Sequence, residues 1–117
     1  MAQHTLTPRT LRHAVAVRRR TADAYVVIEN GDDIVVINVP QGRTSVGRSF
    51  AADIELDDRT VSRRHAILVN DKSGVRILDD RSQNGVYVNG VRTNAHTLRD
   101  GDQIELGRVQ LRYVCAN

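Results

Sequence analysis

From residue 24 onward, short runs of apolar and β-branched residues alternate with clusters of turn-forming residues. Such runs are typical of β-strands, because a helix needs a 3.6-residue apolar period sustained over a longer stretch. The pattern predicts strands near Tyr25–Glu29, Ile34–Val39, Thr44–Val46, Ile54–Leu56, His65–Asn70, Val75–Leu78, Val86–Val88, Gln103–Leu106 and Val109–Val114. Many short strands separated by turns indicate an antiparallel β-sandwich or barrel.

The first 23 residues have a different composition. They are polar and rich in Thr and Arg, and their apolar content is too small to predict a helix or a strand. Five arginines against Asp23 give residues 1–24 a net charge of +4, whereas residues 25–117 carry a net charge of −1. We therefore predict two parts: a flexible basic arm over residues 1–23 and a nearly neutral globular domain over residues 24–117.

Length and composition restrict the class of protein. A chain of 117 residues fits one domain with its own core, and it leaves no room for an effector domain, so we expect an adaptor or a regulated inhibitor. There is no apolar run of a transmembrane helix's length and no signal peptide. The single cysteine, Cys115, excludes a disulfide framework, and we expect a reduced, cytoplasmic setting without metal or cofactor. Sixteen arginines against one lysine favour a bacterial source.

Three loops carry polar residues that suit an oxyanion with extended peptide backbone beside it. They are Gly47-Arg48-Ser49 after one predicted strand, Thr60–His65 before another, and Ser82–Gly85 before a third. Arg forms bidentate, charge-assisted contacts with phosphate oxygens, Ser supplies a hydroxyl donor, and Asn can pair with a peptide backbone. The alternative interpretation is that these arginines are solvated and that the Asn-Gly pairs only form hairpin turns.

The order and spacing of these motifs resemble the forkhead-associated (FHA) domain family. The similarity rests on Gly47-Arg48, Ser62-Arg63-Arg64-His65 and Ser82-Gln83-Asn84-Gly85 with Asn89-Gly90, and it covers roughly residues 24–115. It implies an eleven-stranded, antiparallel, FHA/SMAD-like β-sandwich that binds phosphothreonine peptides and catalyses no reaction. The implied partner is a phosphothreonine-containing protein, such as a Ser/Thr kinase or its substrate.

The family pattern also implies a role for each motif residue. Arg48, Ser62 and Arg63 are implied to bind the phosphate, and Asn84 to contact the peptide backbone. Structural roles fall to Gly47, which permits a tight backbone path, to His65, which braces the Ser62 loop, and to Gly85 and Asn89, which shape the third loop. Gln83 and Thr60 are implied to modify specificity. Gln83 is larger than the residue that the family often has there, and Val86 replaces a common Thr.

The basic arm has several interpretations. Thr5, Thr7, Thr10 and Thr21 lie in it near arginines and are candidate phosphoacceptors. In some small bacterial FHA proteins, a phosphorylated Thr of such an arm occupies the chain's own pocket, and a short linker favours this by raising the effective concentration. The arm of this chain lacks acidic flanks, so a disordered tail or a docking strand are the alternatives.

Other functions fit the residues less well. Residues 42–49 have P-loop spacing, but Arg replaces the required Lys and a strand follows instead of a helix. Residues 80–85 imitate the start of a calcium loop, but Val91 stands where Glu is needed. Ser62 and His65 lack an orienting acid, so no enzyme is expected. Two alternatives remain: a scaffold that uses the sandwich face, with a vestigial phosphate site, and a nucleic-acid or membrane binder that acts through its arm.

Overall fold

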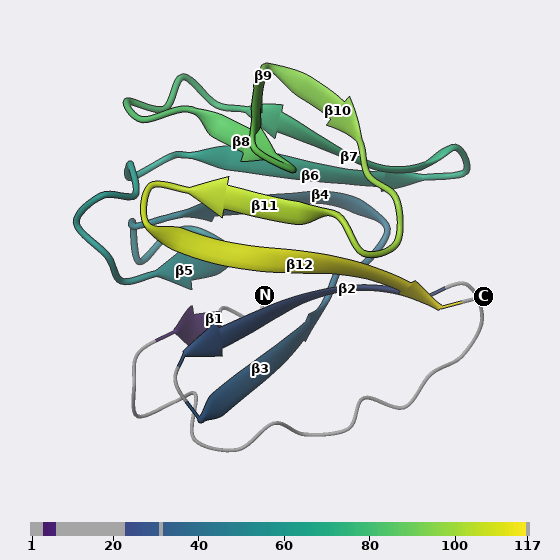
Figure 1. The fold of residues 1–117 in the computed structure, drawn as a ribbon, viewed down its shortest axis with the longest axis horizontal. Helices are drawn as coiled ribbons and strands as arrows, with labels where there is room; N and C mark the ends of the chain where they lie inside the picture. Colours follow the sequence, from purple (N-terminus) through teal and green to yellow (C-terminus); the bar gives the residue numbers. More distant parts are fainter. Residues whose placement is uncertain (1–3, 7–22, 31, 117) are drawn as a thin grey trace.

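The computed structural model describes residues 4–6, 23–30 and 32–116, and these residues form strands and no helix (Figure 1). The strands are β1 (His4–Leu6), β2 (Asp23–Asn30), β3 (Asp33–Asn38), β4 (Gly42–Gly47), β5 (Ile54–Leu56), β6 (Ala66–Asp71), β7 (Gly74–Asp79), β8 (Val86–Val88), β9 (Val91–Thr93), β10 (Ala95–Thr97), β11 (Gln103–Leu106) and β12 (Val109–Ala116). No helix with the length and apolarity of a membrane span occurs in this described part of the chain.

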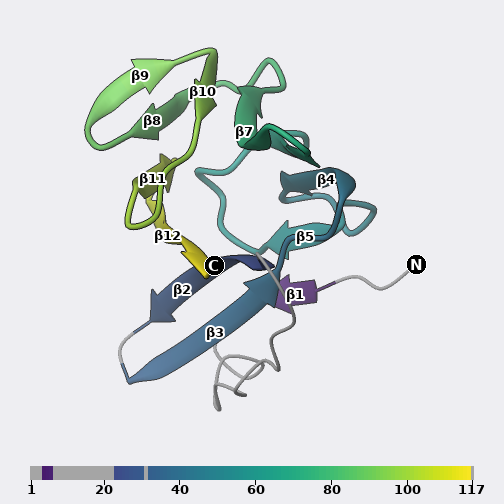
Figure 2. The ribbon, with the colours of Figure 1, turned by 90° about the vertical axis from the view of Figure 1, so that its right-hand side faces the viewer.

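The strands form two six-stranded sheets. One sheet has the order β1-β5-β4-β6-β7-β10 and the other has the order β3-β2-β12-β11-β8-β9. Figure 2 shows the two layers, with β7, β4 and β5 on one side and β8, β11 and β12 on the other. Strands β2 to β12 supply the eleven strands of the predicted sandwich, so the predicted fold class is confirmed, and β1 adds a strand at one edge. The β1–β5 and β4–β5 pairs are parallel, unlike the antiparallel remainder.

The core lies between the sheets because apolar residues alternate with polar ones along the strands. In β7, Val75 and Ile77 point inward and Arg76 points outward, and in β12 the inward residues are Leu111 and Tyr113. A strand reverses its side chains at every residue, so this period of two gives each sheet one buried face. The largest fully buried side chains are Ile37, Ile54, Leu56, Leu68, Ile77, Ile104, Leu106 and His65.

All nine strands predicted from the sequence are present, with ends that differ by a few residues. Three further strands were not predicted. Strands β9 and β10 have three residues each and are largely exposed, so they lack the apolar alternation that marks a strand in sequence. Strand β1 lies within the predicted arm. The other arm residues, 1–3 and 7–22, lie outside the described residues, so the arm's flexibility and its boundary with the domain stay predictions.

Strand direction brings distant loops to one end of the sandwich, on the left in Figure 1. This end, called the site end below, holds the β4–β5, β5–β6, β7–β8 and β11–β12 loops. The opposite end, called the far end, holds the turns at residues 39–41, 72–73, 89–90 and 98–102. The three polar loops singled out in the sequence all lie at the site end.

Candidate functional site

The β4–β5 and β5–β6 loops are joined by backbone hydrogen bonds. Arg48 N–H donates to the Ser62 carbonyl at 2.9 Å, and Ser49 N–H donates to the Arg63 carbonyl at 3.3 Å. The Arg48 side chain adds a third contact, because its Nε donates to the Val61 carbonyl at 2.9 Å. The other N–H donors of this guanidinium have no partner among the described residues, so they are available to an anion beside Ser62.

Gly47 allows these two loops to approach each other. A Cβ atom added at Gly47 would lie 2.0 Å from the Arg63 carbonyl oxygen and 3.1 Å from the Ser62 carbonyl oxygen. No side chain fits in that space, so the backbone of the β5–β6 loop lies directly over Gly47. This close approach places Arg48 beside Ser62.

The His65 side chain connects the β5–β6 loop with the β7–β8 loop. It is fully buried, its Nδ1 accepts a hydrogen bond from Ser62 N–H at 3.0 Å, and its Nε2 lies 2.8 Å from the Gly85 carbonyl oxygen. Because one ring nitrogen must accept and the other must donate, the geometry assigns the neutral tautomer with hydrogen on Nε2. One side chain thus braces the β5–β6 loop against the β7–β8 loop.

The β7–β8 loop is joined to the β5–β6 loop by two further hydrogen bonds. Gln83 N–H donates to Ser62 Oγ at 2.9 Å, and Asn84 Nδ2 donates to the Thr60 carbonyl at 2.7 Å. A hydroxyl that accepts one bond keeps its hydrogen for another acceptor, so Ser62 can donate to an anionic oxygen. The Asn84 amide oxygen is likewise available to a peptide N–H.

A fourth loop, between β11 and β12, supports Thr60. The Thr60 hydroxyl accepts a hydrogen bond from the N–H of Arg108, in this fourth loop, at 2.8 Å. The same hydroxyl donates to Asp58 Oδ1 at 2.6 Å. The hydrogen bond from the Thr60 hydroxyl lowers the pKa of Asp58 below its ordinary value of 3.8, and the bond from Thr60 N–H acts in the same direction. The ionised Asp58 therefore holds Thr60, whose carbonyl in turn positions Asn84.

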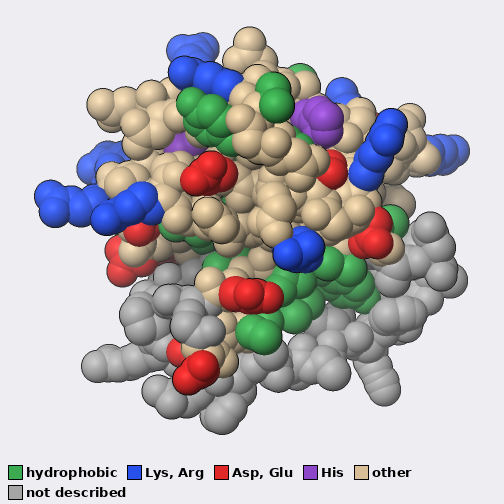
Figure 3. All heavy atoms as spheres, viewed as in Figure 1, with side chains coloured by type: hydrophobic (Ala, Val, Ile, Leu, Met, Phe, Trp, Pro, Cys, Tyr) green, Lys and Arg blue, Asp and Glu red, His purple; other side chains and the backbone are tan. Residues whose placement is uncertain are grey.

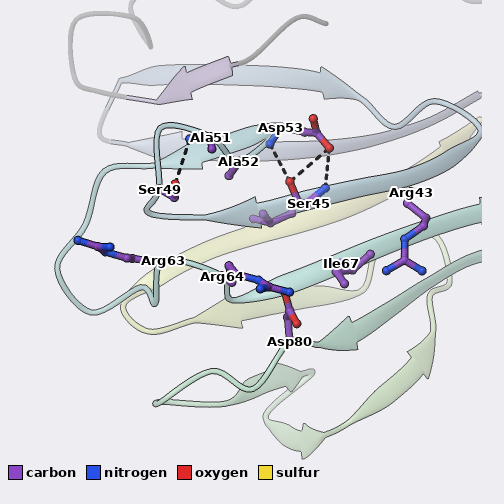
Figure 4. A pocket seen from close by; sticks show the side chains of 11 residues that line it. Arg43, Ser45, Ser49, Ala51, Ala52, Asp53, Arg63, Arg64, Ile67 and Asp80 are labelled. Atoms are coloured by element: carbon purple, nitrogen blue, oxygen red, sulfur yellow. Dashed lines mark hydrogen bonds and ion pairs between the residues drawn. The ribbon is translucent and has the colours of Figure 1, made fainter.

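Two neighbouring cavities open beside these loops. The first, of about 380 Å³, is lined by Ser62, Arg63, Arg64, Asp80 and Arg81. The second, of about 420 Å³, lies over the outer face of β4 and β6 and shares Arg63, Arg64 and Asp80 with the first (Figure 4). Figure 4 shows Arg64 directed at Asp80, while Arg63 points away from the second cavity. Basic side chains project from both ends of the molecule in Figure 3, and those at the site end are arginines, because the single lysine, Lys72, lies in a far-end turn.

The structure brings most of the predicted site residues together, with one exception. Gly47, Arg48, Thr60, Ser62, Arg63, His65, Gln83, Asn84 and Gly85 all lie at the site end. Asn89 lies at the other end of β8, in the turn to β9, where its Nδ2 donates to Asp102 Oδ1. This position corrects the expectation that Asn89 shapes the third loop. The candidate phosphoacceptor Thr5 lies in β1, and Thr7, Thr10 and Thr21 fall outside the described residues.

Sequence reasoning missed three features of the site. Ser82 holds the third loop through its Oγ, which accepts a hydrogen bond from Gly85 N–H at 2.9 Å. Gly107 lies against Thr60, although the sequence marks it only as a turn residue. Arg81 has a left-handed φ of 61°, which no sequence signal predicted. No group of three or more His, Cys, Asp or Glu side chains suited to a metal occurs among residues that the structure describes.

Comparison with known proteins gives a consistent result. The sequence pattern of the FHA domain family matches residues 44–107. The oxoglutarate dehydrogenase inhibitor of Corynebacterium glutamicum is 40% identical over 74 residues, which are 63% of this chain and 52% of that protein. The chain spans about half or less of the length of the curated relatives that it matches.

Solved structures resemble the whole sandwich. An FHA domain from a study of phosphothreonine-dependent FHA interactions superposes with a TM-score of 0.77 at 27% identity, covering 81% of this chain and 98% of that one. EmbR of Mycobacterium tuberculosis, solved in complex with a low-affinity phosphopeptide, superposes with a TM-score of 0.71 at 36% identity. That match covers 81% of this chain and 25% of EmbR.

Proposed function

The chain belongs to the FHA domain family, and we propose that it is a non-enzymatic module that binds phosphothreonine peptides. We propose further that it acts as an adaptor or regulator in Ser/Thr kinase signalling, with a phosphorylated kinase or kinase substrate as its partner. The name of the oxoglutarate dehydrogenase inhibitor supports a regulatory role, and the phosphopeptide bound to EmbR supports the ligand class.

One observation carries the proposal: unpaired donors converge beside Ser62. The Arg48 guanidinium lies against the Val61 carbonyl with its remaining N–H groups available, and Arg63 lines the cavity next to the Ser62 hydroxyl. The buried His65 fixes the loop that holds Ser62 and Arg63, and backbone hydrogen bonds join the Arg48 loop to it. Donors that are positioned before the ligand arrives lose little conformational entropy on binding, which favours a doubly charged phosphate.

The test is calorimetric titration with a phosphothreonine peptide and its unphosphorylated counterpart. We expect micromolar binding of the phosphopeptide and none of the counterpart. Arg48→Ala should weaken binding by about 2–5 kcal/mol, because it removes a charged partner of the phosphate. Arg48→Lys should restore part of the affinity, since it keeps the charge without the bidentate fork.

Arg76→Ala is the matched control. It removes the same charge from an exposed arginine that pairs with Asp71 at the far end, and it should leave binding unchanged. Circular dichroism checks that each variant is folded. Normal phosphopeptide binding by a folded Arg48→Ala variant would reject the phosphate site and favour a scaffold that uses the sandwich face.

Phosphothreonine should bind more tightly than phosphoserine. Burying its extra methyl group contributes about 0.8 kcal/mol, and the stiffer β-branched side chain loses less rotamer entropy. We expect a preference of roughly tenfold. Equal affinities for two peptides that differ only in this methyl group would mean that the site recognises phosphate by charge alone.

We include in the proposal a ligand within the same chain, a phosphothreonine of the N-terminal arm. Strand β1 contains Thr5 and pairs with β5, where Thr5 is in register with Glu55. This pairing supports a position of residues 4–6 at the edge of the first sheet, on the folded domain. After kinase treatment, wild type should lose affinity for an added phosphopeptide, whereas a variant with all four arm threonines replaced by Ala should keep it. Equal affinities before and after treatment would reject self-binding.

A further inference from the structure

Arg81 has a backbone conformation that its residue type disfavours. Arg81 and Asn89 are the two non-glycine residues with positive φ in the described part of the chain, at 61° and 51°. Asn89 is accounted for by its turn, because Asn-Gly is the preferred pair for a two-residue hairpin and Asn tolerates this region. Arg has no such tolerance, since its Cβ crowds the following carbonyl oxygen. A strained residue beside a candidate site points to a role at that site.

The strain is imposed from both sides of Arg81. Asp80 N–H donates to the His65 carbonyl at 2.9 Å, and Ser82 N–H donates to Asp79 Oδ1 at 2.8 Å. These bonds fix the chain before and after Arg81, so residue 81 must bridge them with a left-handed turn. Glycine would do so without strain, which means that the Arg side chain is not needed to form the loop.

Arg81 lines the 380 Å³ cavity together with Ser62 and Arg63. The charges around this cavity do not balance. Arg64 is held by Asp80, with Arg64 Nε 3.1 Å from Asp80 Oδ2, and Asp80 is the single carboxylate among the lining residues. Arg63 and Arg81 therefore remain without an acidic partner among the residues described.

We propose that Arg81 is a specificity-determining residue that binds a carboxylate side chain of the ligand, close to the phosphothreonine. This inference rests on the proposed function, in which Arg48, Ser62 and Arg63 bind the phosphate. Arg81 then presents a second, separate planar fork at the border of the same cavity. A guanidinium fork matches the two oxygens of a carboxylate, so a peptide with Asp or Glu beside the phosphothreonine meets a positive charge that is not already used.

The experiment measures a charge preference rather than total affinity. The full 117-residue chain is titrated with phosphothreonine peptides that carry Glu, Gln, Lys or a second phosphothreonine at one of the four positions on each side of the first phosphothreonine. Wild type should favour Glu over Gln by about three- to fivefold at one position or at two adjacent positions, as for an exposed ion pair. Arg81→Gly should reduce this ratio to about one, and Arg81→Glu should reverse it, so that Lys is preferred to Glu at the same position.

Three controls separate this role from a general loss of charge or fold. Arg76→Ala removes one positive charge at the far end and should keep the wild-type ratio. Arg81→Lys should keep part of the preference, because the charge remains and the fork is lost. Arg81→Gly should melt at the same temperature as wild type or higher, because Gly accepts the left-handed φ.

Two results would overturn this inference while leaving the proposed function intact. One is phosphate-dependent binding with the same Glu-to-Gln ratios in wild type and Arg81→Gly. The other is that wild type prefers peptides with a second phosphothreonine and shows no preference for Glu. That result would mean that Arg81 binds a second phosphate and not a carboxylate. Wild type that binds no phosphopeptide at all would instead reject the proposed function, and this inference with it.

Discussion

Glycine has a different purpose at each end of the sandwich. At the far end, Gly42, Gly74, Gly90 and Gly101 all have positive φ, and a Cβ added to any of them would meet no atom within 4 Å. At the site end, a Cβ would lie 2.0 Å from the Arg63 carbonyl oxygen if added at Gly47, and 2.4 Å from the Thr60 carbonyl oxygen if added at Gly107. Far-end glycines therefore set turn conformations, whereas these site-end glycines let separate loops touch.

The two ends also differ in how their loops are braced. The fully buried His65 ring connects two loops at the site end with two hydrogen bonds. At the far end, the half-buried Asn70 donates from its Nδ2 to the Val39 carbonyl at 2.8 Å. There the exposed Asn89 side chain also bonds to Asp102 Oδ1 and to Gln103 N–H. The site-end loops are thus interlocked by a fully buried ring, whereas the far-end turns are joined by amide side chains that are not fully buried. Interlocking fixes the hydrogen-bond donors of the proposed phosphate site in place before a ligand binds.

Alanine substitution of one glycine at each end should give the largest contrast. Gly47→Ala forces a Cβ into the Arg63 carbonyl, so we expect it to destabilise the fold by about 3 kcal/mol or more and to abolish phosphopeptide binding. Gly74→Ala has open space and a φ of 116°, so it should cost about 1–2 kcal/mol and leave the affinity unchanged. Urea unfolding and titration calorimetry measure the two effects separately.

The contrast between the two ends would be contradicted if Gly74→Ala also weakened phosphopeptide binding. Loop geometry at the two ends would then be coupled through the sandwich. The contrast would equally be contradicted by a Gly47→Ala variant with wild-type affinity. That result would mean that the β5–β6 loop can shift away from Gly47 without moving Ser62 or Arg63.

Alanine substitution of His65 and of Asn70, which brace the two ends, should give a contrast in the same direction. His65→Ala leaves Ser62 N–H and the Gly85 carbonyl without partners, so it should cost about 3 kcal/mol and lower the melting temperature by roughly 10 °C or more. Binding should weaken as a consequence, because the Ser62 loop loses its support. Asn70→Ala should cost about 1 kcal/mol and leave binding intact. A normal melting temperature for His65→Ala with binding lost would instead place His65 in contact with the ligand.

The sequence alone was sufficient to predict those strands in which apolar and polar residues alternate. Alternation of apolar residues in β6, β7 and β12 predicts strands because one face of each must be buried. The site motifs were recognised because the order and spacing of Gly47-Arg48, Ser62–His65 and Ser82–Gly85 resemble the FHA family.

Features that depend on contacts between distant residues could not be predicted in this way. Strands β9 and β10 are exposed, and pairing with β8 and β7 defines them, rather than an apolar pattern of their own. Asn89 was assigned to the site although a hairpin turn explains it fully. The positive φ of Arg81 follows from hydrogen bonds that fix its two neighbours, and no local signal marks it.

The smallest expected effect is on the free energy of unfolding at acid pH, through Asp58 at the site end. The Thr60 hydroxyl and N–H hold the pKa of Asp58 below 3.8, so the folded state favours its ionised form. A lowered pKa stabilises the fold above the ordinary pKa, and this stabilisation is lost as the pH falls through the folded value. Wild type should exceed Asp58→Asn in unfolding free energy by about 1 kcal/mol or less above pH 5, because the pair is partly exposed. The difference should shrink below about pH 4 and vanish once Asp58 is protonated. Urea unfolding of both chains from pH 7 to pH 3 makes the measurement. A difference that stays constant over this range would show that the carboxylate charge does not hold Thr60, and that the site end is supported by backbone contacts alone.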